Sequence, residues 1–261
     1  MTAVVPPAAA SGRRVRAVLI AALAALAAAA WQWLLPMHMA PMSVLRLDMP
    51  AGPIVWSAGT ALFVFVVWSV MMAAMMISSA LAMISVHDRV TRARSSAHPL
   101  ASTVAFAAAY LIVWIGFSAL VTAVQWQLER GGLMSDMMAS ANAWLSGGLL
   151  IVAGLFQWSP LKHACLGKCR SPIAFILNEW RPGIGGALVA GLRHGIYCLG
   201  CCWALMALLF VFGTMNLAAA AALAVLVLAE KMLPWGHRIA RGAGVVFVAL
   251  GGWLVAAAIA G

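Results

Sequence analysis

The chain has 261 residues, of which 65% are hydrophobic and only 8% are charged, so its apolar surface exceeds what one soluble core of this size could hide. Its net charge of +10 does not indicate nucleic acid, because the basic residues fall in short stretches between long apolar runs. Composition therefore predicts an integral membrane protein that has the lipid bilayer as its solvent, and it excludes a soluble nucleic-acid-binding protein.

Apolar runs divide the chain into candidate membrane helices, since a helix needs about 20 residues to cross roughly 30 Å of hydrocarbon. Seven spans are expected, at residues 17–35, 54–84, 100–125, 141–158, 188–212, 217–229 and 242–259. The sixth is the shortest, and its flanks must lengthen it if it is to cross. The first has no convincing cleavage site after it, so we interpret it as a retained span and not as a signal peptide.

The distribution of positive charge predicts the orientation, because lysine and arginine are retained on the cytoplasmic side. With the amino terminus inside, 13 of the 16 lysines and arginines fall in inner segments. We therefore expect an all-α, polytopic transmembrane helix bundle of about seven spans, in a bacterial inner membrane, with a cytoplasmic amino terminus. Residues 1–16 form a basic tail in this interpretation, and residues 17–261 form a single transmembrane domain.

Cysteines lie in two inner segments. The segment WSPLKHACLGKCRSP is expected to form a loop after the fourth span, and RHGIYCLGCCW lies in the fifth span, where its histidine and three cysteines share an arc of about 100°. A single cysteine in a membrane helix is usually a small hydrophobic residue, but five thiols with two histidines on one side indicate metal binding or redox chemistry. The candidate ligands here are Cys165, Cys169, Cys198, Cys201, Cys202, His163 and His194.

Methionines form a second sulfur pattern. The second span contains MMAAMM, whose four methionines occupy one side of the helix, and an outer segment reads PMHMAPM. Methionine is otherwise a flexible packing residue, so the doubled motif is the informative feature. Thioethers bind Cu(I) and cannot form disulfides, which suits the outer side of the membrane, whereas thiolates suit the reducing inner side. The further candidate ligands are Met71, Met72, Met75, Met76, Met37, His38 and Met39.

The softness of these ligands selects Cu(I), zinc or iron–sulfur clusters, and the methionines favour Cu(I), with zinc as the alternative. The leading hypothesis is a non-enzymatic protein that binds Cu(I) for metal transfer, transport or metalloenzyme assembly, with a copper-dependent enzyme or a metallochaperone as partner. Two alternatives stay open. One is a membrane thiol-disulfide oxidoreductase that uses the CxxC and CxxxC pairs, and the other is a membrane scaffold with a structural zinc site.

Several other residues receive ordinary structural interpretations. His87 is expected on the solvated face of a basic inner loop. Glu230 and Lys231 are expected to form an interfacial ion pair where the sixth span ends. Ser159 precedes a proline and is typical of a turn. Gly191 and Gly195 have the small-residue spacing that lets another helix approach closely.

The chain resembles an uncharacterised bacterial family described as predicted metal-binding integral membrane proteins. The resemblance rests on MMAAMM, WSPLKHACLGKCRSP, GIYCLGCCW, and GTMN followed by EKMLPWG, and it runs from about Met71 to Arg241. It implies a metal-binding membrane protein without a defined substrate or reaction. The positions that it makes functional are Met71, Met72, Met75, Met76, Cys165, Cys169, Cys198, Cys201 and Cys202.

Overall fold

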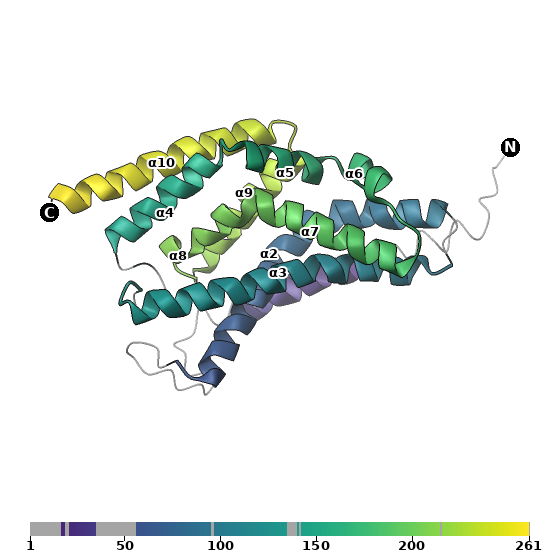
Figure 1. Cartoon of the computed structure of the whole chain (residues 1–261), viewed down its shortest axis with the longest axis horizontal. Helices are drawn as coiled ribbons and strands as arrows, with labels where there is room; N and C mark the ends of the chain where they lie inside the picture. Colours follow the sequence, from purple (N-terminus) through teal and green to yellow (C-terminus); the bar gives the residue numbers. More distant parts are fainter. Residues whose placement is uncertain are drawn as a thin grey trace.

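The protein is all-α, as predicted (Figure 1). The computed structural model describes residues 17–18, 21–34, 56–94, 97–134, 140, 142–214 and 216–260. After a helix at Ala21–Leu34, the elements are α2 (Ala58–Ala93), α3 (Pro99–Arg130), α4 (Ala143–Phe156), α5 (Pro160–Arg170), α6 (Pro172–Glu179), α7 (Gly183–Ala207), α8 (Leu209–Phe212), α9 (Leu217–Met232) and α10 (Gly236–Ala260).

The prediction of seven spans is wrong. In the described ranges, four helices are long and apolar enough to cross a membrane: α2, α3, α7 with its continuation α8, and α10. The pair α4 and α5 adds at most a fifth span, because the two helices meet at an angle of 63°. The described part of the chain therefore has four to five candidate membrane spans.

Local sequence explains why the remaining apolar runs are shorter than expected. α4 has only 14 residues, and Ser159 and Pro160 then start α5 in a new direction. The Ser159 hydroxyl caps α5 by accepting a hydrogen bond from the backbone N–H of Lys162, at 3.1 Å, and proline is favoured in a first helical turn. α9 has 16 residues and ends just before Pro234, which is shorter than a span requires.

Glycines set the closest helix contacts. Gly191 and Gly195 of α7 face α3, where a side chain on Gly191 would collide with the backbone carbonyl of Phe106. The predicted close approach at these two glycines is confirmed. α4 and α10 pack together along one edge of the molecule (Figure 1), with Gly147 against Gly251 and Gly154 against Gly244. These contacts fix α7 against α3, and they hold the start of α10 near α5.

The turn between α2 and α3 and the junction between α6 and α7 lie at the same end of the bundle. The Arg94 guanidinium after α2 stacks over the Trp180 ring before α7, with its carbon 4.4 Å from the ring centroid. Arg193, about three turns into α7, pairs with Glu179 at the end of α6. Basic side chains thus gather at this end, which is the end that the charge rule assigns to the cytoplasm.

Candidate metal centre

Thiols from two helices gather at the contact between α5 and α7. Cys198, Cys201 and Cys202 are buried on α7, and their spacing of three and four residues puts them on one helix face. α5 packs on α7 and brings the Cys169 side chain near Cys198 and Cys201. The Cys165 sulfur lies against Gly200, on the same side of α7. The segment that carries Cys165 and Cys169, which was expected to be a loop, is therefore a helix.

Cys198 is the centre of this cluster. Its sulfur lies 3.2 Å from the Tyr110 hydroxyl oxygen of α3 and 3.0 Å from the Lys231 ammonium nitrogen of α9. The side chains of Cys169, Cys201 and Cys202 also lie near Cys198. Polar groups from α3, α5 and α9 thus lie near one buried sulfur atom of α7.

The remaining α7 thiols are turned toward the backbone. Cys201 and Cys202 donate hydrogen bonds to the Cys198 carbonyl oxygen, at 3.0 Å and 2.9 Å, and all five cysteines are free thiols. Over the described part of the chain, no group of three or more His, Cys, Asp or Glu side chains is arranged to hold a metal ion as it stands. Capture of an ion by Cys201 or Cys202 would therefore replace the hydrogen bond that each thiol donates to the Cys198 carbonyl.

The methionine motif lies inside the bundle. All four methionines of MMAAMM are buried in the same core as Cys198, Cys201 and Cys202. The Tyr110 hydroxyl, which contacts the Cys198 sulfur, also donates a hydrogen bond to the backbone carbonyl of Met76, at 3.1 Å. Ser79 donates to the same carbonyl, at 3.0 Å, and it also accepts a hydrogen bond from Lys231. The methionine segment therefore adjoins the thiols and does not face lipid.

The two candidate histidine ligands lie in different environments. His194 is buried one turn before Cys198, with its ring centroid 5.2 Å from that of Tyr110, and its Nδ1 atom has no hydrogen-bond partner among the described residues. His163 on α5 lies beside His237 of α10, with ring centroids 5.1 Å apart, and the buried Nε2 atom of His163 also lacks a partner within the described ranges. His194 thus adjoins the thiol cluster, whereas His163 groups with a histidine that the sequence analysis did not select.

Three residues of the outer methionine segment, Met37, His38 and Met39, lie outside the described residues. Their part in any metal site remains a prediction. Among the described residues, the candidate ligands that share one core therefore come from α2, α5 and α7, with α3 and α9 in contact.

His87 was expected to be solvated and is instead buried, with 2% of its surface exposed. α2 continues to Ala93, beyond the predicted end of the span at residue 84, so His87 stays on a helix face and stacks on Phe106 with ring centroids 4.6 Å apart. Asp88 is buried beside it, and the Nε–H of Arg92 donates to both oxygens of the Asp88 carboxylate, each at 3.0 Å. Extending the predicted helix beyond its apolar segment would have placed His87 on a helix face and not in a solvated loop.

Glu230 and Lys231 do not pair with each other, contrary to the expectation. Neighbouring residues on a helix point about 100° apart, so they face different partners. Glu230 forms a buried ion pair with Lys162 of α5, at 2.6 Å, while Lys231 contacts Cys198 and Ser79. Sequence analysis therefore missed two residues that contact Cys198, namely Lys231 and Tyr110. For Lys231, the 100° offset from Glu230 on the helix indicated that the two side chains face different partners.

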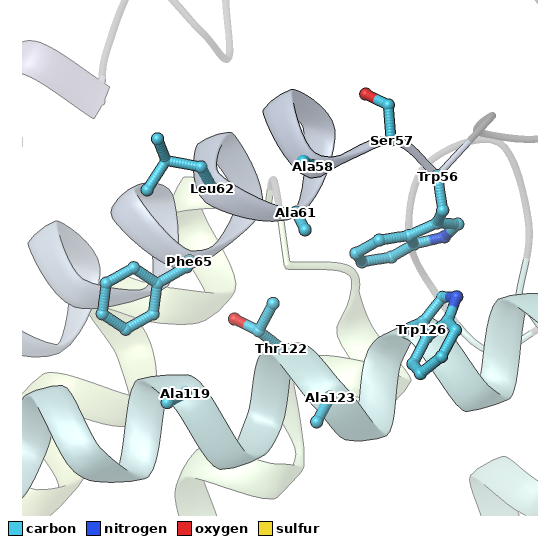
Figure 2. Close-up of a pocket in the computed structure, with 10 residues that line it drawn as sticks. All are labelled: Trp56, Ser57, Ala58, Ala61, Leu62, Phe65, Ala119, Thr122, Ala123 and Trp126. Carbon is cyan, nitrogen blue, oxygen red and sulfur yellow. The ribbon is translucent and has the colours of Figure 1, made fainter.

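An apolar groove with a volume of about 540 Å³ lies at the other end of α2 and α3. Figure 2 shows the Trp56 and Trp126 rings beside it, with small and apolar side chains along the rest of the wall. It is lined by Trp56, Ser57, Ala58, Ala61, Leu62, Phe65, Ala119, Thr122, Ala123 and Trp126. None of these side chains carries a sulfur or an imidazole, so this groove is not the candidate metal centre.

Comparison with known proteins identifies a family. The model of the family PpoB2, described as a copper chaperone, matches residues 65–254. No curated protein and no solved structure matches the chain. The matched range contains the four methionines of MMAAMM and all five cysteines.

Proposed function

The chain belongs to the PpoB2 copper chaperone family, and from this membership and its buried sulfur cluster we propose that it binds Cu(I) inside the helix bundle and passes it to a copper protein. The partner in this proposal is a copper-dependent enzyme under assembly or a metallochaperone. Copper is the cargo of the protein and not a resident cofactor. The proposed location is a bacterial inner membrane, with residues 1–16 as a cytoplasmic tail and residues 17–261 as one transmembrane domain.

The observation that carries the proposal is the convergence on Cys198. Thiols from α5 and α7 meet there, and one tyrosine hydroxyl links the Cys198 sulfur to the methionine segment of α2. Thiolate and thioether sulfurs are soft ligands, and soft ligands select Cu(I) over ions that prefer oxygen. Because the chain has only six acidic residues, ions that prefer carboxylates find few ligands.

A path for the ion follows from the order of these ligands. The outer residues Met37, His38 and Met39 would collect copper, the methionines of α2 would hold it within the bilayer, and the thiols of α7 would receive it. Cys169 and Cys165 of α5, with His163 and His194 nearby, would then transfer it at the inner side. Thioethers on the oxidising side and thiols on the reducing side keep each ligand in the form that binds Cu(I). The same path serves transfer in the opposite direction.

The close approach of four thiols also favours a second candidate, a structural zinc site, because zinc is commonly held by four cysteine thiolates. Neighbouring thiols at the same place would equally serve a dithiol–disulfide cycle. Metal analysis separates these functions from copper binding, since each leaves a different species on the purified protein.

We expect the full-length protein, purified anaerobically in detergent with Cu(I) supplied, to retain copper through gel filtration. The variant with Cys198→Ser, Cys201→Ser and Cys202→Ser should lose it, because hydroxyls are poor ligands for a soft ion. The measurement is elemental analysis combined with thiol titration before and after reduction. Tightly held zinc in place of copper would support the scaffold, and a reducible disulfide without metal would support the oxidoreductase. Either result would contradict the proposal.

A further inference from the structure

Lys231 places a positive charge inside the thiol cluster. It lies in the last turn of α9, where the helix dipole favours a cation, and only 7% of its surface is exposed. Its ammonium nitrogen lies 3.0 Å from the Cys198 sulfur and 3.0 Å from the Ser79 hydroxyl oxygen. Ser79 belongs to α2 and itself donates to the Met76 carbonyl oxygen, so α2 helps to fix the position of the charge.

The ammonium group has no carboxylate partner among the residues that the structure describes. The three ion pairs found there are Arg92–Asp88, Lys162–Glu230 and Arg193–Glu179. Glu230, the neighbour of Lys231 in sequence, is already paired with Lys162. A buried charge is costly unless an opposite charge compensates it. The Cys198 sulfur, which lies beside the Lys231 ammonium, can supply that opposite charge as a thiolate.

The charge balance of a metal complex at this position depends on the ion. The complex of a monovalent ion with two thiolates carries one net negative charge, which the Lys231 ammonium neutralises. The complex of a divalent ion with the same two thiolates is neutral and leaves the ammonium uncompensated. A divalent ion therefore needs a third thiolate to neutralise the ammonium. The difference in electrostatic energy between these two complexes is larger in a low-dielectric interior than it would be in water.

We propose that Lys231 is the fixed counter-charge of a two-thiolate complex centred on Cys198, and that it thereby selects monovalent Cu(I) over divalent ions such as zinc. The second thiolate comes from Cys169 of α5, or from Cys201 or Cys202, whose thiols contact the Cys198 backbone carbonyl. This inference rests on the proposed function. It adds the residue that sets the charge, and hence the selectivity, of the same site.

The test compares Cu(I) and Zn(II) affinities of the full-length protein in detergent, each measured against a chromophoric chelator at fixed pH. We expect Lys231→Met to raise the dissociation constant for Cu(I) by at least about 30-fold, the loss typical when one partner of a buried charge pair is removed. The dissociation constant for Zn(II) should stay the same or fall. Lys231→Arg, which keeps the charge, should retain the preference for Cu(I).

Lys168→Met is the matched control, because Lys168 is exposed on α5 and its loss removes a positive charge away from the cluster. If Lys231→Met does not fold, as judged by gel filtration and circular dichroism, Lys231→Gln supplies a neutral polar replacement. Unchanged Cu(I) affinity in these neutral variants, or an equal loss for both metals, would overturn the inference while leaving the proposed function intact. Failure of the wild-type protein to bind Cu(I) would overturn the proposed function and this inference together.

Discussion

Cys198→Ser is expected to weaken Cu(I) binding more than any other single cysteine substitution, by at least about 100-fold. Loss of a group that merely orients a ligand typically costs 10- to 100-fold in metal affinity, and loss of a direct ligand costs more. Cys198 is also the sulfur on which Lys231, Tyr110 and the other thiols converge. Competition with a chromophoric Cu(I) chelator measures the change.

Cys165→Ser is the matched control for this prediction. Its sulfur packs against Gly200 at the edge of the cluster, so its replacement should reduce the Cu(I) affinity less. An equal loss of Cu(I) affinity in the two variants would show that Cys165 and Cys198 contribute equally to binding, and it would contradict the central position of Cys198.

Lys162→Met is expected to destabilise the fold by about 3–5 kcal/mol, the usual cost of breaking a buried ion pair from one side. The Lys162 ammonium and the Glu230 carboxylate lie 2.6 Å apart, with side-chain exposures of 0% and 2%. Without Lys162, the Glu230 carboxylate would be a buried charge without compensation. Unfolding in detergent by a graded denaturant, followed by circular dichroism, gives the change in free energy.

The double variant Lys162→Met, Glu230→Gln separates the charge effect from the packing effect. With both charges removed, most of the lost stability should return, because buried ion pairs often contribute little beyond their own desolvation cost. A double variant as unstable as Lys162→Met would indicate that the loss comes from packing between α5 and α9 instead.

Sequence length and hydropathy predicted the all-α membrane architecture but not the number of spans. Hydropathy depends on composition, and the runs at 141–158 and 217–229 are apolar enough to resemble spans. Their actual helices are short because Ser159 and Pro160 redirect the chain by 63° after α4, and because α9 ends at charged residues and a proline. The Ser-Pro pair was interpreted as a turn, whereas it also caps the helix that carries Cys165 and Cys169.

Local helical spacing predicted which side chains of α7 and α2 share a face, since that depends on a single helix. It could not predict Lys231 or His87, whose burial depends on how distant segments pack. Lys231 reaches Cys198 only because α9 packs against α7, and His87 is buried only because α3 places Phe106 over it. The family resemblance indicated a metal, and the match to the copper chaperone family specifies copper.

X-ray absorption at the copper edge of the Cu(I)-loaded protein shows whether sulfur atoms from α2, α5 and α7 hold copper inside the bundle. We expect a first coordination shell of sulfur alone, which Cys198→Ser should deplete. A first shell of nitrogen or oxygen atoms, unchanged by that substitution, would contradict it.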